Sequence, residues 1–364
     1  MSDGRVMRSE YMEWAKANQI APYTLAYSGI KGMSLGELGA SLADLALDGP
    51  PGYGHPPLRE ALAATAGVGP ERVVLATGTS GANHLVFATL VAPGDPIAME
   101  RPVYEPMENL ARHLGADVRF FARRHENGFR VDPADVAAAM TPKTKAIVLS
   151  SLHNPSSAAT DESTLRAIGE IAERVGAKVV VDEVYLDAAF EHAPPSAPTL
   201  GDVFLATTSL TKVFGLGGLR CGWIVAEPEL AERMWRLKNL FGVNEAHPAE
   251  RLAHVALRKR GAILARARSI LDANRPLWHR FLDSRSDLDA PRLPFGTTSF
   301  PRVLGVGASA LCEHLRARFA TSLVPGRFFG ADDHVRVGLG GDPATFPEGL
   351  DRLGRALDEL RAGR

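Results

Sequence analysis

Four things are scarce in this sequence: cysteine, lysine, net charge and long apolar runs. Its two cysteines, Cys221 and Cys312, are too few for a disulfide framework and lack the spacing of metal ligands. The 41 basic and 42 acidic residues give a net charge of −1, which supplies no field to attract nucleic acid or an anionic membrane. No run approaches the roughly 18 apolar residues of a membrane-spanning helix, and the N-terminus has no apolar signal segment. These absences predict a cytoplasmic protein without a nucleic-acid or membrane partner.

The scarcity of lysine makes each lysine informative. Only eight of the 41 basic residues are lysine, and the other 33 are arginine. With 45% apolar and 23% charged residues, the composition is otherwise that of an ordinary globular protein. A lysine among small and apolar residues is therefore unusual in this chain.

Short apolar runs alternate with amphipathic helical patterns from about residue 57 onward. This alternation is typical of an α/β protein with a mostly parallel sheet flanked by helices. We expect strands at 73–77, 97–100, 118–121, 146–150, 179–182, 203–209 and 222–226. We expect helices at 58–66, 82–90, 107–114, 133–140, 162–175 and 229–241.

The pattern changes after this region, which predicts a second, smaller domain. A long helical stretch at 248–282 leads to expected strands at 298–304 and 335–339 and expected helices at 308–319 and 347–361. At about 150 residues per domain, the length allows two domains. We expect a large domain at 49–283, and a smaller α+β domain formed by the arm 1–48 together with 284–364.

The segment TTSLTKVFGLGGLRCGW, residues 207–223, contains the most unusual lysine. Lys212 follows a predicted strand and has small and apolar neighbours. Burial would lower the pKa of its amine and let it form a Schiff base, although the position alone fits a solvated loop lysine equally well. Ser209 and Arg220 are donors of the kind that hold a phosphate, and the nearby glycines let the backbone approach it. The neighbours therefore favour a phosphate-bearing ligand beside Lys212.

A second motif, VVVDEVY, ends a buried strand in a carboxylate. Asp182 fits a helix cap, the commonest role for such a residue, or a carboxylate that pairs with a protonated ring nitrogen of a cofactor. Tyr185 is three residues further on and fits either a packing residue or a hydroxyl donor to the same ligand.

The turn ATGTSGAN, residues 76–83, joins a predicted strand to a helix. Its backbone N–H groups and the hydroxyls of Thr79 and Ser80 favour an anion. Glu100 ends the next strand, as the ribose-binding acid does in dinucleotide folds, but the G-x-G-x-x-G spacing is missing. Asn154 follows another strand, and the proline after it favours an extended conformation, as in an ordinary Asx-Pro turn.

Together these motifs resemble the pyridoxal-phosphate-dependent aminotransferases of class I and II, which have fold type I. The resemblance extends from about Tyr53 to Arg336, with the motifs in the family's order and at its spacing. It implies a pyridoxal 5′-phosphate cofactor, no metal, and a homodimer with shared active sites. The implied reaction transfers an amino group between an L-amino acid and a 2-oxo acid.

The resemblance also implies a role for each residue. Lys212 would form an aldimine with the cofactor and move a proton at the substrate Cα, while Asp182 would pair with the pyridinium nitrogen. The other implied roles are contacts to the ring's phenolic oxygen by Asn154 and Tyr185, ring stacking by Tyr104, phosphate binding by Thr79, Ser80, Ser209 and Arg220, a phosphate contact in the neighbouring subunit by Tyr53, and substrate binding by Arg336, Asn154 and Gly29.

The sequence departs from the family pattern at three places. Cys221 follows the phosphate-binding arginine, where an aliphatic residue is usual, and Asn154-Pro-Ser-Ser replaces Asn-Pro-Thr-Gly. The stretch 239–243 lacks the arginine that family members acting on aspartate place near there. We therefore expect a neutral or apolar amino donor, unless Lys238 or a residue of the partner chain supplies a cation.

Other functions remain open at this point. A lyase, decarboxylase, synthase or oxidase of the same fold would use the same cofactor residues. Ser209 and Lys212 also fit the S-x-x-K of serine acyl enzymes, but the Ser-Asp-Asn and Lys-Thr-Gly elements of that class are missing. A non-enzymatic, cofactor-sensing domain of a regulator would need a DNA-binding module, which the sequence does not contain.

Overall fold

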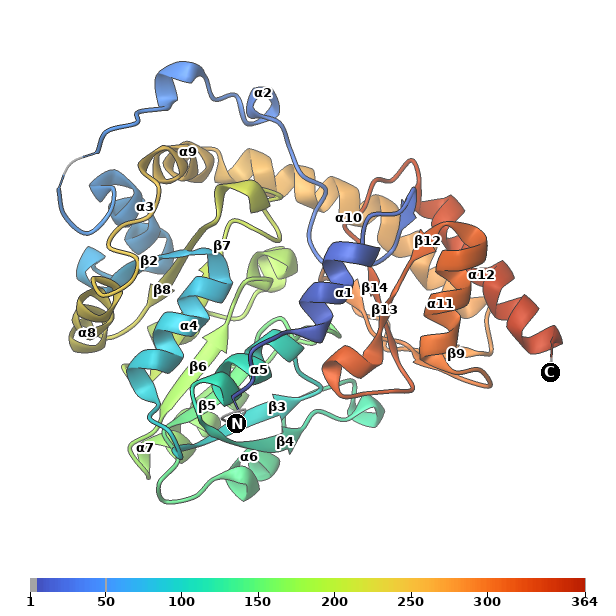
Figure 1. Cartoon of the computed structure of the whole chain (residues 1–364), viewed down its shortest axis with the longest axis horizontal. Helices are drawn as coiled ribbons and strands as arrows, with labels where there is room; N and C mark the ends of the chain where they lie inside the picture. The colour runs from blue at the N-terminus through green and yellow to red at the C-terminus, as the bar shows by residue number, and fades with distance from the viewer. Residues whose placement is uncertain (1–4, 50, 364) are drawn as a thin grey trace.

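The computed structural model describes residues 5–49 and 51–363. Its largest element is a seven-stranded sheet in the order β2-β8-β7-β6-β5-β3-β4 (Figure 1). The strands are β2 (Val73–Thr77), β3 (Pro96–Arg101), β4 (Asp117–Ala122), β5 (Ala146–Ser150), β6 (Lys178–Asp182), β7 (Phe204–Ser209) and β8 (Cys221–Val225). These positions match the strands predicted from the sequence within one residue at each end.

One strand runs against the others. β8 is antiparallel to both β2 and β7, whereas all other neighbours in the sheet are parallel. A parallel connection needs a crossover of a dozen or more residues, but β7 and β8 are joined by residues 210–220, which contain only the short 3-10 helix η6 (Gly217–Leu219). The expected mostly parallel sheet is therefore confirmed, with one antiparallel strand.

Helices cover both faces of this sheet. They are α3 (Pro56–Ala66), α4 (Gly78–Leu90), α5 (Glu105–His113), α6 (Pro133–Ala139), α7 (Glu162–Glu173), α8 (Pro228–Lys238), α9 (His247–Arg258) and α10 (Arg260–Asp283). Alternate residues of β5 contribute to two different core clusters, because successive side chains of a strand point to opposite faces. The sheet and helices α3 to α10 are here called the large lobe.

The predicted helical stretch 248–282 is two helices. α9 ends at Arg258 and α10 begins at Arg260, with Lys259 between them. The Lys259 amine donates to the carbonyl oxygens of Leu38 and Gly39, which ties this break to the N-terminal arm. In Figure 1, α10 then runs from the large lobe toward the C-terminal part of the chain.

Both ends of the chain build the second unit, here called the small lobe. β1 (Tyr23–Thr24) from the arm pairs with β12 (Thr321–Ser322), and the expected α+β unit of N- and C-terminal segments is thus confirmed. Its other elements are α1 (Glu10–Asn18), β9 (Leu288–Asp289), β10 (Thr298–Ser299), β11 (Arg302–Val303), α11 (Ala308–Phe319), β13 (Val324–Pro325), β14 (Val335–Gly338) and α12 (Phe346–Ala362). Helix α2 (Leu35–Leu38) of the arm lies instead against the junction of α9 and α10 in the large lobe (Figure 1).

The expected strand 298–304 is two short strands instead of one. β10 pairs with β14, and β11 pairs with β9. Pro301 lies between them, and proline has no N–H to continue a ladder. The remaining 3-10 helices are η1 (Leu42–Asp44), η2 (Pro70–Arg72), η3 (His125–Asn127), η4 (Leu186–His192), η5 (Ala197–Leu200) and η7 (Gly326–Phe329).

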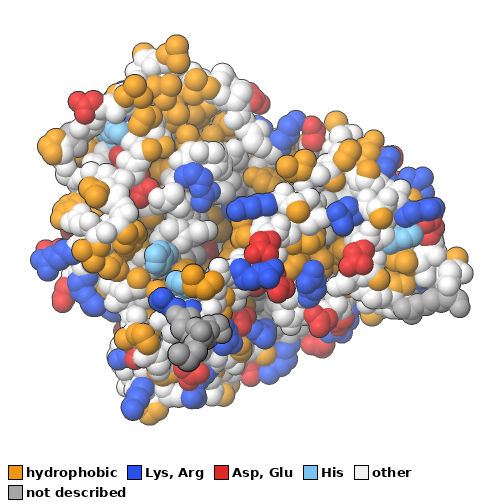
Figure 2. Space-filling model, viewed as in Figure 1, with side chains coloured by type: hydrophobic (Ala, Val, Ile, Leu, Met, Phe, Trp, Pro, Cys, Tyr) orange, Lys and Arg blue, Asp and Glu red, His pale blue; other side chains and the backbone are white. Residues whose placement is uncertain are grey.

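The surface carries charges of both signs in close alternation over much of the face shown in Figure 2. Hydrophobic side chains gather at the top of that view, over the segment that contains α2 in Figure 1. Leu42 and Leu47 in this segment are largely exposed. Across residues 5–49 and 51–363, no helix has the length and apolarity required to span a bilayer.

Candidate functional site

A cavity of about 260 Å³ lies at the carboxyl ends of strands β5, β6 and β7. Parallel strands bring their carboxyl ends to one edge, which is where open α/β sheets bind ligands. Helix α1 of the small lobe closes one side through Met12. The residues around the cavity are Met12, Thr79, Ser80, Asn83, Glu100, Val103, Tyr104, Met107, Ser150, Asn154, Asp182, Val184, Tyr185, Thr211, Lys212 and Arg220.

Lys212 projects into this cavity from the loop after β7. Its Nζ donates a hydrogen bond of 3.0 Å to Ser28 Oγ, and Tyr185 Oη donates one of 2.9 Å to the same oxygen. Burial of the amine lowers the pKa of Lys212 below the usual value for lysine. The site therefore contains an amine that loses its proton more readily than a surface lysine.

Asp182 ends β6 on the same side of the sheet. Its Oδ2 accepts from Asn83 Nδ2 at 3.2 Å, its Oδ1 accepts from the Val184 N–H at 3.0 Å, and Asn83 Oδ1 in turn accepts from Thr207 Oγ1 at 2.6 Å. Burial raises the pKa of Asp182 to about 6, although these hydrogen bonds favour the ionised form. A buried carboxylate held in this way favours a cationic partner in the cavity.

Hydroxyls and a guanidinium meet at the start of α4. Thr79 Oγ1 donates to Ser209 Oγ at 2.8 Å, and Ser80 lies beside Thr79 on the cavity wall. Arg220 donates only weakly, to the carbonyl oxygens of Thr77 and Gly217 at 3.4 and 3.5 Å. No carboxylate of the described residues pairs with Arg220. This end of the cavity thus offers a free cation, hydroxyls and a helix N-terminus, which together suit a phosphate.

Two glycines permit this arrangement. Gly78 has φ +68°, and a Cβ there would clash with the Arg220 guanidinium. Gly222 packs against the backbone of Gly78, so a side chain at 222 would force β8 away from the turn. The close approach of strand, turn and arginine therefore depends on the absence of side chains.

Arg336, in β14 of the small lobe, is completely buried beside the cavity. Its Nη1 donates to Asn154 Oδ1 at 3.1 Å, and its Nη2 donates to Tyr11 Oη at 2.9 Å and to the Ala26 carbonyl oxygen at 3.1 Å. Its Nε is buried without a partner among the described residues. This buried guanidinium faces no carboxylate of residues 5–49 and 51–363 and keeps a spare donor, so it is suited to a ligand carboxylate.

Tyr104 lies on the opposite wall, at the N-terminus of α5. Its hydroxyl contacts Met12 Sδ at 3.3 Å, and its ring meets the edge of Tyr11 with centroids 5.2 Å apart. Burial raises the pKa of Tyr104 well above that of a free phenol. Aromatic and thioether groups therefore dominate the part of the cavity that α1 covers.

Eight of the residues predicted from the sequence surround this cavity: Lys212, Asp182, Tyr185, Thr79, Ser80, Tyr104, Asn154 and Arg220. Ser209 and Arg336 bond directly to two of them, and Gly29 lies against the backbone of Lys212. Tyr53 is elsewhere in the chain, where its ring stacks on Trp235 with centroids 4.8 Å apart and 44% of the residue is exposed.

The structure removes two alternatives that the sequence left open. Lys238 does not supply a free cation, because its buried amine pairs with Glu245 at 2.7 Å and with the Leu75 carbonyl oxygen at 2.9 Å. Glu100 is not available to a ribose, since its oxygens accept from Ser150 and Arg123 at 2.5 to 2.8 Å. The alternative of a dinucleotide site at Glu100 is thereby removed.

Sequence reasoning missed several residues of the site. Asn83 follows Thr79 by four residues, so helical spacing places the two on one face of α4, and this signal was available. The contacts of Tyr11 and Met12 had no such signal, because the arm reaches the cavity only through the tertiary fold. The resemblance placed Gly29 at the substrate, but it did not give the contact of the neighbouring Ser28 with Lys212.

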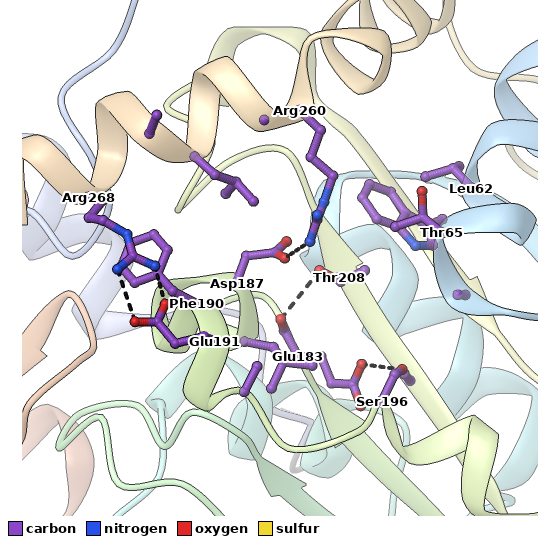
Figure 3. A pocket seen from close by; sticks show the side chains of 18 of the residues that line it. Leu62, Thr65, Glu183, Asp187, Phe190, Glu191, Ser196, Thr208, Arg260 and Arg268 are labelled. Carbon is purple, nitrogen blue, oxygen red and sulfur yellow. Dashed lines mark hydrogen bonds and ion pairs between the residues drawn. The ribbon is translucent and has the colours of Figure 1, made fainter.

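A second, larger cavity of about 820 Å³ lies between α3, η4, α10 and the sheet (Figure 3). Figure 3 shows that the charged groups around it are paired with one another, Arg260 with Asp187 and Arg268 with Glu191. Glu183 bonds to Ser196 Oγ and the Ala197 N–H. This cavity therefore contains no free charge comparable with Arg220, and the smaller cavity is the candidate site.

Known proteins agree with this assignment. Residues 41–353 match the family model described as aminotransferase class I and II. The chain is 31% identical to capreomycidine synthase of Streptomyces vinaceus, over 97% of this chain and 94% of that protein. It is 32% identical to the arginine–pyruvate transaminase AruH of Pseudomonas aeruginosa, over 80% and 76% of the two chains. The crystal structure of a PLP-dependent aminotransferase from Streptococcus suis 89-1591 superposes with a TM-score of 0.92, at 28% identity and 98% coverage of both chains.

Proposed function

Because this chain belongs to the class I and II aminotransferases, which are pyridoxal-phosphate enzymes, we propose that it transfers an amino group from an L-amino acid with a neutral or apolar side chain to a 2-oxo acid. The observation that carries the proposal is the single cavity that joins Lys212, Asp182 and Arg220, with Arg336 one hydrogen bond away through Asn154. Deprotonation of an amino acid at Cα requires a base, an electron sink and a fixed carboxylate, and this site has groups for all three.

The residues present fit the cofactor. The unpaired Arg220 and the hydroxyls near α4 suit its phosphate, and the buried carboxylate of Asp182 suits its ring nitrogen. When bound, pyridoxal phosphate supplies the electron sink that makes the Cα–H of the amino acid acidic. The residues that would hold it are Thr79, Ser80, Ser209 and Arg220 at the phosphate, Tyr104 at the ring face, Asn154 and Tyr185 at the phenolic oxygen, Asp182 at the ring nitrogen, and Lys212.

Lys212 serves as the base at Cα. Burial lowers the pKa of its amine, so Lys212 gives up its proton more readily than an ordinary lysine and can accept one from Cα and later return it. Asp182 would hold the ring nitrogen as an ionised carboxylate, because a cationic partner in the cavity would offset the burial that raises its pKa to about 6.

Arg336 binds the α-carboxylate of the substrate. Its spare Nε and its position beside Asn154 allow a charge-assisted contact with that group. Gly29 and Ile30 keep the arm against Lys212, since the Ile30 N–H donates to the Lys212 carbonyl oxygen at 2.8 Å. The arm thus covers the side of the cavity where the substrate would lie and excludes water from it.

The preference for a neutral or apolar side chain follows from what surrounds the cavity. Its charged lining residues are Lys212, Asp182, Arg220 and Glu100, and each is either assigned to the cofactor or paired. The groups that remain near α1 are Tyr11, Tyr104 and Met12. Within the described residues of this chain, no further charge faces a substrate side chain.

We also propose a cytoplasmic homodimer in which Tyr53 contacts the phosphate in the partner subunit. Tyr53 is half exposed and is removed from the cavity of its own chain. Leu47 is 90% exposed and Leu240 is 80% exposed, with Phe241 and Val243 also exposed nearby in sequence. Exposed apolar side chains in such number are costly on a monomer and support burial against a second copy. Two buried free cysteines are consistent with a reducing compartment.

A second candidate is a different reaction on the same cofactor. The chain is similar to capreomycidine synthase over 97% of its length. Because that relative is named as a synthase and not as a transaminase, the similarity favours this alternative. The roles of Lys212, Asp182 and Arg336 would be unchanged, because all such reactions begin by loosening a bond at Cα.

A half-reaction screen tests both candidates. The purified protein loaded with pyridoxal phosphate is mixed with single amino acids, and its absorption spectrum is followed without any 2-oxo acid. Transamination converts the cofactor stoichiometrically to the pyridoxamine form and releases one 2-oxo acid per site. Consumption of an amino acid with an unchanged cofactor and without release of a 2-oxo acid would instead establish the second candidate. A protein that does not bind the cofactor would contradict both.

A further inference from the structure

The hydroxyl of Ser28 contacts two of the groups that the proposed function uses. Ser28 Oγ lies 3.0 Å from Lys212 Nζ and 2.9 Å from Tyr185 Oη, and the residue is only 3% exposed. Ser28 belongs to the arm between β1 and α2, and it is 184 residues from Lys212 in sequence. This contact forms a chain of three polar atoms, Tyr185 Oη, Ser28 Oγ and Lys212 Nζ, inside the site.

The chemistry of a hydroxyl makes this contact unusual. A serine hydroxyl has one donor hydrogen and two acceptor lone pairs, whereas a backbone carbonyl only accepts and an ammonium only donates. Ser28 can accept from Lys212 when the amine is protonated and donate to it when the amine is neutral. The hydrogen bond can therefore persist in both protonation states of Lys212.

The backbone around Ser28 is held at two places, by Thr297 and by the Lys212 carbonyl oxygen. Thr297 Oγ1 donates to the Ser28 carbonyl oxygen at 2.7 Å, and the Ile30 N–H donates to the Lys212 carbonyl oxygen at 2.8 Å. A Cβ at Gly29 would lie 3.0 Å from that same Lys212 oxygen, so the arm is in close contact with the loop of the lysine. Ser28 is thus held at a set distance from Lys212 by both lobes.

We propose that Ser28 is a positioning residue that holds the Lys212 amine, together with the Tyr185 phenol, in both protonation states. This role rests on the proposed function of Lys212 as the base at Cα. On losing its proton the amine gains a lone pair, and a hydroxyl, unlike a backbone carbonyl, can donate to it. A hydrogen bond accepted from an ammonium is charge-assisted and therefore stronger than one made with a neutral amine, so the hydroxyl favours the protonated form of Lys212.

The test measures Lys212 in the cofactor-free full chain. Competitive acetylation with acetic anhydride across a pH series, read by peptide mass spectrometry, gives the midpoint pH at which this one lysine becomes reactive. Loss of the hydroxyl in Ser28→Ala removes a stabilising contact of the ammonium, so the midpoint should fall by about one pH unit. Ser28→Thr keeps a hydroxyl and should return the midpoint to the wild-type value.

Ser156→Ala is the matched control. Ser156 is similarly buried, and its Oγ also contacts two groups, His153 Nδ1 at 2.7 Å and the Ala158 N–H at 3.2 Å, but it does not contact Lys212. The Ser156→Ala variant should lower the free energy of unfolding as Ser28→Ala does, and it should leave the midpoint pH of Lys212 acetylation unchanged. An unchanged midpoint in Ser28→Ala, or an equal shift in Ser156→Ala, would overturn the proposal.

Turnover gives a second readout. Ser28→Ala should lower kcat about tenfold while KM changes less than twofold, because the contact is to the base and not to the substrate. A rise in KM with an unchanged kcat would place Ser28 in substrate binding and contradict the proposal. Since acetylation needs neither cofactor nor substrate, failure of the proposed transamination would leave the acetylation result interpretable by itself.

Discussion

Arg336 of the small lobe donates a hydrogen bond of 3.1 Å to the side-chain oxygen of Asn154 in the large lobe. The two residues are 182 positions apart, and both are buried. This bond joins the proposed carboxylate site to the proposed cofactor site. A substrate held by Arg336 would therefore present its Cα near the phenolic oxygen of the cofactor, which Asn154 is proposed to contact. The lobes therefore meet where the chemistry is proposed to occur.

Replacement of Arg336 tests the carboxylate assignment. Arg336→Ala should raise KM for every amino acid substrate to a similar degree and lower kcat/KM by roughly 100-fold, because all of them share the α-carboxylate. Steady-state kinetics on several donors checks this. Arg318→Ala, at an exposed arginine on α11, is the control and should change neither parameter. A loss limited to one donor would place Arg336 in the side-chain pocket instead.

Asn83 should set the pH range of cofactor binding through Asp182. Burial raises the pKa of Asp182 to about 6, and the Asn83 hydrogen bond opposes that rise by stabilising the ionised form. Affinity for pyridoxal phosphate should therefore fall as the pH drops through about 6. In Asn83→Ala the pKa of Asp182 is higher still, so the fall should begin at a higher pH. Fluorescence titration of the cofactor-free protein measures both midpoints, and identical midpoints would refute the coupling.

Glu183 should make the fold less stable as the pH rises. Burial raises its pKa to about 7 in the folded protein, above the ordinary 4.5, so the folded state binds the proton more tightly than the unfolded state. This contribution is complete below about pH 4.5 and is lost as the pH rises through 7. Glu183→Gln removes the titration and should lessen the loss of stability between pH 5 and 8 by up to about 3 kcal/mol.

Denaturant unfolding at several pH values measures this difference. Glu191→Gln is the control, since the pKa of Glu191 is lowered to about 2 and that exposed carboxyl stays ionised over the whole range. Parallel stability curves for wild type and Glu183→Gln between pH 5 and 8 would show that Glu183 does not titrate there.

Subunit mixing tests whether Tyr53 acts in the partner's site. Lys212→Ala should bind cofactor but show no turnover, and Tyr53→Ala should bind the phosphate more weakly. If the sites are shared, a mixed dimer of the two variants has one site with both defects and one intact site. Unfolding and refolding an equal mixture should then recover about a quarter of the wild-type activity, since half of the dimers are mixed and each has one intact site of two.

The matched comparison is a mixture of Lys212→Ala with Asp182→Ala. Both of these residues lie in the cavity of the same chain, so their mixed dimer has one defect in each site and no intact site. Recovery in the first mixture but not in the second would support a shared site. Equal recovery in both mixtures, or in neither, would contradict the role of Tyr53.

The sequence by itself determined the strands, most of the helices and the groups at the strand ends. β2, β5 and α11 lie at the predicted positions, because local periodicity and the Gly, Asn and Asp residues that follow each strand are sufficient to identify them. Lys212, Asp182, Tyr185 and Asn154 were predicted for the same reason. Each ends or follows a strand, and the carboxyl ends of parallel strands meet at one edge.

Only the tertiary structure decided how distant parts of the chain meet. The antiparallel direction of β8 and the pairing of Lys238 with Glu245 depend on packing that local patterns do not encode. Ser28 and Tyr11 belong to an arm without strong periodicity, and they reach Lys212 and Arg336 because β1 pairs with β12. Their positions follow from contacts across hundreds of residues, so only the folded chain reveals them.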